Sequence, residues 1–174
     1  MDPSGIMIPA WVDGKLTPVE KRAAHQLGLR HPAVSVFVIR DGATLIQRRA
    51  LSKYHTPGLW ANTCCTHPSW DEDPLHCATR RLKEELGITG LELIHRGQVE
   101  YRADVGGGLT EHEVVEVFVA QAGADMPLAL NPDEVMETRW IKAADLATAI
   151  AENPDTFTPW LRIYLANHAD MILG

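Results

Sequence analysis

The sequence has few cysteines, fewer basic than acidic residues and no long apolar run. Its 174 residues include three cysteines, at positions 64, 65 and 77, and this odd, clustered set is not typical of a secreted disulfide framework. The 23 acidic and 16 basic residues give a formal charge of −7. This balance argues against binding to nucleic acid or to a membrane surface.

No apolar segment approaches the ~20 residues that a helix needs to cross a bilayer. The first residues, MDPSGIMIPAW, lack the basic start and the long apolar centre of a secretory signal. We therefore expect a cytoplasmic protein in a reducing compartment. The adjacent Cys64 and Cys65 then need another explanation, because neighbouring cysteines close too tight a ring to be a common structural disulfide.

The length of the chain and its 45% hydrophobic content are sufficient for one domain with a core of its own. No repeat or low-complexity linker divides it, so we expect a single domain over residues 1–174. Its first 20 residues are expected to form an irregular arm with short strand potential.

Hydrophobic patterns and turn signals predict the remaining elements. The predicted elements are a β-hairpin over 33–49, an ordered loop over 50–70, a helix over 72–87, a second hairpin over 91–122, a strand over 135–142, and helices over 143–154 and 158–173. Pro74 and Gly87 mark the start and the end of the central helix, and Thr158 with Pro159 opens the last one. This order predicts an α/β fold of the α+β sandwich type.

The central helix ends in a run of charges. Arg80 and Glu84, like Arg81 and Glu85, are four residues apart and share a helix face. By itself such a run is typical of solvated ion pairs.

The segment around this run, TCCTHPSWDEDPLHCATRRLKEELGI, resembles the Nudix box. The matching positions are Glu72, Arg80, Leu82, Glu84, Glu85, Gly87 and Ile88. Two positions depart from the pattern: Thr66 stands in place of a glycine, and Arg81 in place of a metal-binding glutamate. Hydrolytic members use that carboxylate to hold metal and activate water. A guanidinium is instead suited to binding a diphosphate.

Further motifs resemble those of the type I isopentenyl-diphosphate isomerases. They run in order as KRAAH (21–25), RRALSK (48–53), PGLWANTCCTHP (57–68), RRLKEELG (80–87), YRAD (101–104), EHE (111–113), NPDEV (131–135) and FTPW (157–160). The resemblance covers nearly the whole chain. It implies a Nudix-like mixed β-sheet flanked by helices, and an isomerase that interconverts isopentenyl and dimethylallyl diphosphate in isoprenoid biosynthesis.

The same resemblance implies a set of site residues. The implied acid–base and cation-stabilising residues are Cys65, Glu113, Tyr101 and Trp160; the diphosphate-binding residues are Lys21, Arg49, Lys53, Arg80 and Arg81. One divalent ion is implied at His25, His31, His67, Glu111 and Glu113, and a Mg²⁺ at Glu85 with the backbone carbonyl of Cys65. By this assignment Cys65 is the reactive cysteine, and Cys64 occupies a position at which the family accepts other residues.

The residue pattern supports the first metal set. Glu111 and Glu113 are two apart on a predicted strand, so both project to one face and His112 to the other. Three imidazoles and two carboxylates suit Mn²⁺ or Zn²⁺ better than Mg²⁺ or Ca²⁺. The remaining histidines, at positions 55, 76, 95, 112 and 168, are interpreted as surface or hydrogen-bonded residues.

Two other hypotheses stay open at this point. The Glu84–Glu85 pair also fits a Nudix hydrolase of a nucleotide or prenyl diphosphate. A zinc-binding or redox-sensing module could use Cys64, Cys65, His67 and Cys77, although adjacent cysteines lack the usual zinc-ligand spacing. We expect no flavin, because no glycine-rich phosphate loop follows a strand and the chain is shorter than the ~250 residues of a typical flavin-binding barrel. The expected partner is the small-molecule substrate, and the sequence does not define an oligomeric state.

Overall fold

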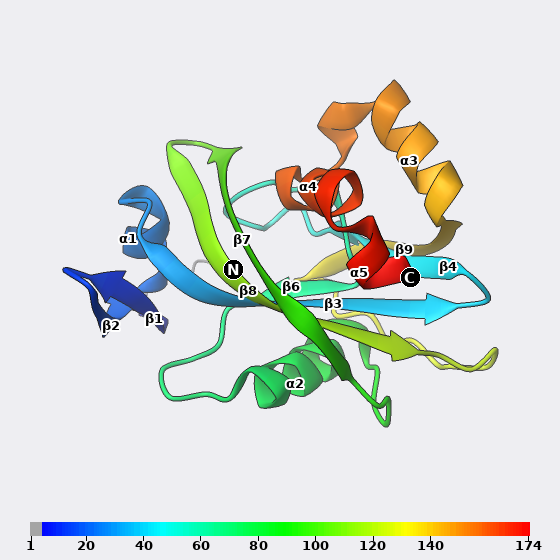
Figure 1. Ribbon diagram of the computed structural model, residues 1–174, viewed down its shortest axis with the longest axis horizontal. Helices are drawn as coiled ribbons and strands as arrows, with labels where there is room; N and C mark the ends of the chain where they lie inside the picture. Colours follow the sequence, from blue (N-terminus) through cyan, green and yellow to red (C-terminus); the bar gives the residue numbers. More distant parts are fainter. Residues whose placement is uncertain (1–4) are drawn as a thin grey trace.

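The computed structural model describes residues 5–174, which fold around a seven-stranded mixed sheet (Figure 1). Its strands are β3 (Arg30–Arg40), β4 (Ala43–Arg49), β5 (Trp60–Ala61), β6 (Cys64–Thr66), β7 (Ile94–Gly106), β8 (Leu109–Gln121) and β9 (Val135–Lys142). The sheet order is β5-β4-β3-β8-β7, with β6 paired to β3 and β9 paired to β4. β3 and β8 run parallel, and the other pairs are antiparallel.

β3 is the central strand, and both of its faces are covered. Val34, Val36 and Val38 pack in one apolar cluster with helix α2 (Pro74–Leu86). Phe37 and Ile39 pack in a second cluster with the C-terminal helices. Because successive side chains of a strand point to opposite faces, a nearly continuous apolar run such as β3 requires cover on both sides. Figure 1 shows α2 below the sheet and α3, α4 and α5 above it, which confirms the expected α/β sandwich.

Helix α2 forms where the sequence predicted it. The side chain of Asp73 accepts hydrogen bonds from two backbone N–H groups of the first turn, and Pro74 occupies the first helical position. Gly87 ends the helix in the left-handed region, with a φ of 68°. A Cβ at this position would lie 2.6 Å from the Cβ of Ala129, so glycine is required by contact as well as by conformation.

The N-terminal segment is more regular than expected. β1 (Met7–Val12) and β2 (Lys15–Glu20) form a two-stranded antiparallel sheet, and helix α1 (Lys21–Gln26) follows. Asp13 and Gly14 both have positive φ and make the tight turn between the strands. The strand potential is thus confirmed and the irregular arm is wrong for residues 5–20, while residues 1–4 lie outside the described residues.

The C-terminal region differs from the prediction in one place. α3 (Ala143–Glu152), the short 3₁₀ helix η1 (Pro154–Thr156), α4 (Pro159–Asn167) and α5 (Ala169–Leu173) follow one another. The single helix predicted over 158–173 is wrong, because His168, with φ −135° and ψ 18°, separates α4 from α5. The predicted cap Thr158 is confirmed, since its hydroxyl accepts from the N–H of Leu161.

The start of α4 is tied to the sheet. The backbone N–H of Thr158 donates to the carbonyl of Trp60 in β5 at 2.9 Å. The loop predicted over 50–70 contains this short strand, which pairs with β4, and also β6, which pairs with the central strand β3. In residues 5–174 no helix combines the length and apolar character needed to cross a bilayer.

Candidate active site

One pocket gathers side chains from α1, β4, the β4–β5 loop, β6, α2, β8 and α4. The residues expected at the site that line it are Lys21, Arg49, Lys53, Cys65, His67, Arg81, Glu85, Glu111, Glu113 and Trp160. Others lie beside it: His25 and His31 are fully buried next to Glu111, Tyr101 is buried next to Glu113, and Arg80 lines an adjoining hollow. The structure therefore brings all of the expected site residues into one region.

The two cysteines that follow one another in β6 point to opposite faces of the sheet. Cys64 is fully buried in the apolar cluster between α2 and the sheet, to which Cys77 of α2 also belongs. Cys65 lines the pocket and contacts the other cluster. This alternation is the ordinary geometry of a strand, and it gives Cys64 a packing role and Cys65 access to the site.

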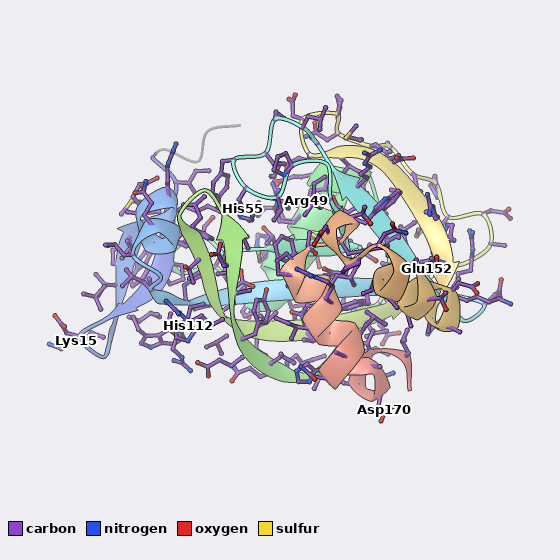
Figure 2. The ribbon with its side chains drawn as sticks, turned by 90° about the horizontal axis from the view of Figure 1, so that it is seen from above. Lys15, Arg49, His55, His112, Glu152 and Asp170 are labelled. Carbon is purple, nitrogen blue, oxygen red and sulfur yellow. The ribbon has the colours of Figure 1, made fainter. Side chains whose placement is uncertain are left out.

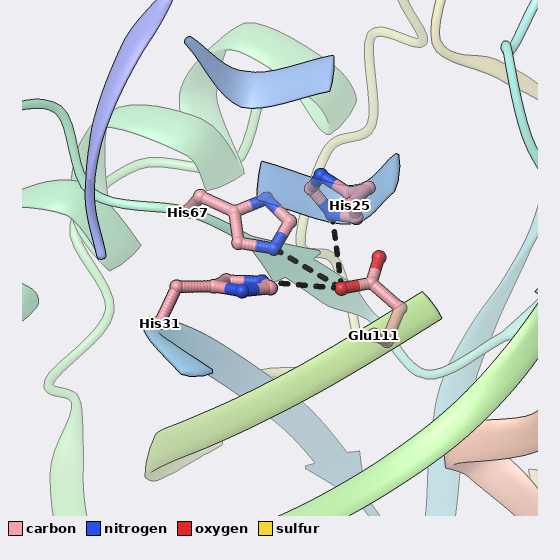
Figure 3. Close-up of side chains that lie close together, drawn as sticks. All are labelled: His25, His31, His67 and Glu111. Carbon is pink, nitrogen blue, oxygen red and sulfur yellow. Dashed lines mark hydrogen bonds and ion pairs between the residues drawn. The ribbon is translucent and has the colours of Figure 1, made fainter. Parts of the chain in front are cut away.

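Three histidines converge on one oxygen of Glu111 (Figure 3). The Nε2 atoms of His25, His31 and His67 lie 3.0, 3.3 and 3.5 Å from Glu111 Oε2. One donor atom from each of the four residues lies within 4.8 Å of the others. Glu113 adjoins this group through His67, whose Nε2 is 2.7 Å from Glu113 Oε1.

The backbone around these histidines fixes the direction of their rings. The Nδ1 of His25 is 2.5 Å from the carbonyl oxygen of Lys21, one turn earlier in α1. The Nδ1 of His31 is 2.7 Å from the carbonyl oxygen of Leu29. An N–H at each Nδ1 donates to these carbonyls, so each Nε2 is directed at Glu111 and carries the lone pair when the ring is neutral. This is the tautomer in which histidine binds a metal.

The electrostatics of the cluster fit a bound cation. Burial lowers the pKa of His31, but the hydrogen bonds that His31 donates to Glu111 and Glu113 outweigh burial and raise the pKa to about 10. Burial raises the pKa of Glu111, yet the hydrogen bonds of the surrounding histidines hold it well below its usual range. The centre thus favours positive charge, and its mixed nitrogen and oxygen donors fit a divalent metal ion.

Glu113 and Cys65 have separate hydrogen-bond partners. The hydroxyl of Tyr101 donates to Glu113 Oε2, while His67 contacts the other oxygen. The hydroxyl of Ser35 donates to Cys65 Sγ at 3.3 Å and accepts from the hydroxyl of Tyr164 at 2.8 Å. Burial and the nearby charge of Glu113 raise the pKa of Cys65, which keeps its thiol protonated.

A set of basic side chains lines the outer part of the pocket. Burial, helped by the positive charges of Lys53 and Arg81, lowers the pKa of Lys21 to about 8. Lys53 Nζ lies 2.5 Å from Glu134 Oε2, and an Arg81 nitrogen lies 3.1 Å from the other oxygen of Glu134. Arg49 is buried and its guanidinium lies 5.4 Å from the ring centre of Trp160. Such a concentration of cations in an acidic protein favours an anionic ligand.

Arg80 is expected to bind the diphosphate, and it faces the hollow that adjoins this pocket. It shares that hollow with Lys21, Lys53 and Arg81. Two of its nitrogens bind the carboxylate of Glu72 at 2.7 and 2.8 Å, and the third lies 2.9 Å from Glu84. Its charge is therefore largely committed to protein carboxylates.

Glu85 is held between two donors. Arg81 lies 2.7 Å from its Oε1, and the amide nitrogen of Gln47 lies 2.9 Å from its Oε2. Glu85 is buried and lines the same pocket as Cys65. A hard oxygen donor beside an anion site suits Mg²⁺. Its use here, with the carbonyl of Cys65, stays a prediction.

His55 was interpreted from the sequence as a surface or hydrogen-bonded residue, and the structure places it beside the Glu111 cluster. His55 is buried in the β4–β5 loop, and its Nε2 lies 3.0 Å from Glu111 Oε1. Figure 2 shows His55 near Arg49, whereas His112, on the far face of β8, contacts Glu100. His55 stands in an irregular loop without periodicity, so no sequence signal linked it to Glu111. Glu134 was present only as part of the NPDEV motif.

A known protein family matches most of this chain. Residues 29–161 match the NUDIX domain family. The isopentenyl-diphosphate Delta-isomerase of Cereibacter sphaeroides is 64% identical over 168 residues, covering 97% of this chain and 95% of the relative. The protein of the same name from Dinoroseobacter shibae is 62% identical, covering 97% of this chain and 96% of the relative.

Solved structures support the fold. A crystal structure of a Deinococcus radiodurans protein superposes with a TM-score of 0.72 at 15% identity, covering 92% of this chain and 96% of that one. A MutT NUDIX hydrolase from Burkholderia pseudomallei gives a TM-score of 0.62 at 25% identity, covering 80% and 98%. The resemblance found in the sequence motifs is thereby confirmed, and the chain belongs to the isopentenyl-diphosphate Delta-isomerase family of NUDIX-domain proteins.

Proposed function

We propose that this protein converts isopentenyl diphosphate to dimethylallyl diphosphate and back, as a flavin-independent isomerase. The observation that carries the proposal is the pocket itself, in which Cys65 and Glu113 share a space with four basic side chains, Lys21, Arg49, Lys53 and Arg81. The two proton-transfer groups suit an allylic rearrangement, and the cations suit a diphosphate. The names of relatives 64% and 62% identical to the chain agree with this activity.

The reaction adds a proton to C4 of isopentenyl diphosphate and removes one from C2. It therefore needs an acid and a base positioned on either side of a flat carbon chain. Cys65 provides a thiol that burial keeps protonated, and Glu113 provides a carboxylate. The hydroxyl of Tyr101 fixes one oxygen of Glu113 and is in place to pass a proton to it.

Trp160 forms an aromatic wall of the pocket. It is buried, and its position is set by the attachment of α4 to β5. The negative face of an indole ring stabilises a developing cation, and an apolar wall keeps water away from it. Both effects lower the barrier for a carbocation-like transition state.

The basic side chains hold the non-reacting end of the substrate. Lys21, Arg49, Lys53 and Arg81 bind the diphosphate, and Arg80 adds positive charge from the adjoining hollow. Fixing this end places C2 and C4 between Cys65 and Glu113. Glu85 and the carbonyl of Cys65 would hold a Mg²⁺ against the diphosphate oxygens.

The second metal set would hold Mn²⁺ or Zn²⁺ through His25, His31, His67, Glu111 and Glu113. When bound, such an ion supplies fixed positive charge beside Glu113. The histidines and Glu111 also keep the Glu113 carboxylate in one orientation, through the 2.7 Å contact with His67. We further propose a cytoplasmic location, in keeping with three free thiols.

The two other hypotheses fit the structure less well. A hydrolase would need a carboxylate where Arg81 stands, and this arginine instead neutralises Glu84, Glu85 and Glu134. A cysteine-based zinc or redox module would need its thiols together. In the described residues Cys64 of β6 and Cys77 of α2 lie in the apolar cluster between that helix and the sheet, on the other face from Cys65, and the histidine cluster contains no cysteine.

Turnover in D₂O tests the proposal. The protein is incubated with Mg²⁺ and isopentenyl diphosphate, and the products are followed by proton NMR, with Cys65→Ala and Cys64→Ala in parallel. We expect dimethylallyl diphosphate with deuterium in a methyl group, a loss of at least 100-fold in Cys65→Ala and retained turnover in Cys64→Ala. Release of phosphate in place of isomerisation would establish the hydrolase instead.

A further inference from the structure

His55 binds the oxygen of Glu111 that the other histidines leave free. Oε2 of Glu111 faces His25, His31 and His67, at 3.0, 3.3 and 3.5 Å. Oε1 lies 3.0 Å from the Nε2 of His55. The two oxygens of the Glu111 carboxylate therefore have different partners. Oε2 points toward the three clustered histidines, and Oε1 contacts His55 on the other side.

The hydrogen-bond network indicates which atom of His55 carries the proton. Its Nδ1 lies 3.0 Å from the hydroxyl of Thr56, which can donate to it. The proton then sits on Nε2 and is donated to Glu111. Thr56 has a φ of 46°, a conformation that is costly for a β-branched residue. The surrounding loop therefore holds this pair in place against local strain.

Aromatic contacts lock the His55 ring. It packs edge-to-face against Tyr54, with ring centres 4.5 Å apart, and against Trp160, with ring centres 5.9 Å apart. The backbone carbonyl of His55 also accepts a hydrogen bond from Arg49 at 3.1 Å. His55 is 6% exposed and lines the pocket, so these contacts restrict the orientation of its ring.

From this geometry we infer that His55 is a positioning residue for the His/Glu metal centre, one that directs Oε2 of Glu111 toward a Mn²⁺ or Zn²⁺ ion. Metal-binding carboxylates are commonly oriented by a hydrogen bond to their second oxygen, and loss of such a partner costs about 10- to 100-fold in metal affinity or activity. His55 also joins the metal centre to the Trp160 wall. The inference rests on the proposed function only in taking this cluster as a metal site.

Metal affinity is the direct test, and it does not depend on turnover. Wild type, His55→Ala and His55→Gln are stripped of metal, and dissociation constants for Zn²⁺ and Mn²⁺ are measured by competition with a chelator. We expect His55→Ala to bind about 10- to 100-fold more weakly. His55→Gln should recover much of this loss, because a glutamine amide N–H can replace the Nε2 donor.

The matched control is His112→Ala. His112 adjoins Glu111 in the chain, but its side chain is on the outer face of the sheet, 3.3 Å from Glu100. Its loss should leave metal affinity within about twofold of wild type. Unfolding curves of the metal-free variants check that each one folds. If His55→Ala does not fold, the metal affinity of His55→Gln still tests the inference.

Two results would overturn the inference: metal binding by His55→Ala as tight as by wild type, or a glutamine variant no better than the alanine one. Isomerisation by wild type is assayed separately in the same preparations. A wild type that isomerises while either of those results holds would refute the role of His55 and leave the proposed function standing. If the wild type does not isomerise the substrate but the variants show the expected metal affinities, the role of His55 stands and the proposed function is refuted.

Discussion

At the residue scale, the Glu113 carboxylate is shared between two neighbours with different tasks. His67 connects one oxygen to the metal cluster, and Tyr101 donates its hydroxyl to the other. The contact with Tyr101 involves atoms that take part in the proposed proton transfer, rather than atoms that hold the diphosphate. Its loss should therefore change the rate of the chemical step more than substrate binding.

We expect Tyr101→Phe to lower kcat about 10- to 100-fold, because a hydrogen bond to a charged group contributes about 1.5–3 kcal/mol. KM should change little, since the ring and its packing remain. Steady-state kinetics give both quantities, and the unfolding midpoint checks the fold. A raised KM with unchanged kcat would contradict this assignment.

Arg81 acts on the other end of the substrate. It lies between three carboxylates and faces the pocket, whereas Lys83, two residues later on the same helix, is exposed. We expect Arg81→Gln to raise KM at least tenfold, because the diphosphate loses a cation and meets freed carboxylates. Lys83→Gln, which removes the same charge, should leave KM unchanged. Equal effects of the two substitutions would mean that only net charge matters.

At the scale of the element, Glu72 connects the loop after β6 to helix α2 through hydrogen bonds and an ion pair. It accepts from the backbone N–H of Ser69 at 2.8 Å and binds the guanidinium of Arg80 through both oxygens. The hydrogen bonds of Arg80 lower the pKa of Glu72 to about 2, from an ordinary value of 4.5. This contribution to stability is therefore complete above pH 4.5 and is lost as pH falls toward 2.

Glu72→Gln should accordingly destabilise the protein at pH 7 by a modest amount, ~1 kcal/mol for a partly exposed ion pair. The difference from wild type should shrink as pH is lowered through the range from 4.5 toward 2. Urea unfolding curves at several pH values measure it. A difference that grows on acidification would show that Glu72 does not act as a paired carboxylate.

Elements with clear end signals could be predicted from the sequence, and those without them could not. Asp73, Pro74 and Gly87 each set a boundary of α2 by their own chemistry. Helix α1 has only six residues and is capped by a glutamate, Glu20, which is not a common capping residue. The break at His168 likewise lacks a proline or glycine, so nothing in the local sequence indicated it.

The site residues likewise differ in whether the sequence could indicate them. Its main residues stand in motifs that resemble a known family, so the sequence indicated them before their contacts were known. His55 depends on a tertiary contact between a loop and β8, 56 residues away along the chain. Such a contact leaves no periodic trace in the sequence. Residues that orient the site from loops therefore needed the three-dimensional arrangement.

At the scale of the whole molecule, the His/Glu centre joins parts of the chain that are far apart. His25 comes from α1, His31 from β3, His67 from the loop after β6 and Glu111 from β8. An ion held by all four links the N-terminal region to the sheet. A ligand that binds only the folded state stabilises it by about 2.7 kcal/mol at a concentration of 100 times Kd.

Removal of metal should therefore lower the melting temperature by about 5–10 °C, given that each kcal/mol shifts it by about 2–4 °C in a chain of this size. Calorimetry with and without a chelator, followed by addition of Zn²⁺ or Mn²⁺, measures the shift and its reversal. The variant His25→Ala loses one donor and should respond much less to the chelator. The melting temperature of this variant without metal reports the effect of the substitution on the packing of α1. The comparison therefore separates the contribution of packing from that of metal binding. An unchanged melting temperature in chelator-treated wild type would mean that the four donors are held together by their own hydrogen bonds and not by an ion.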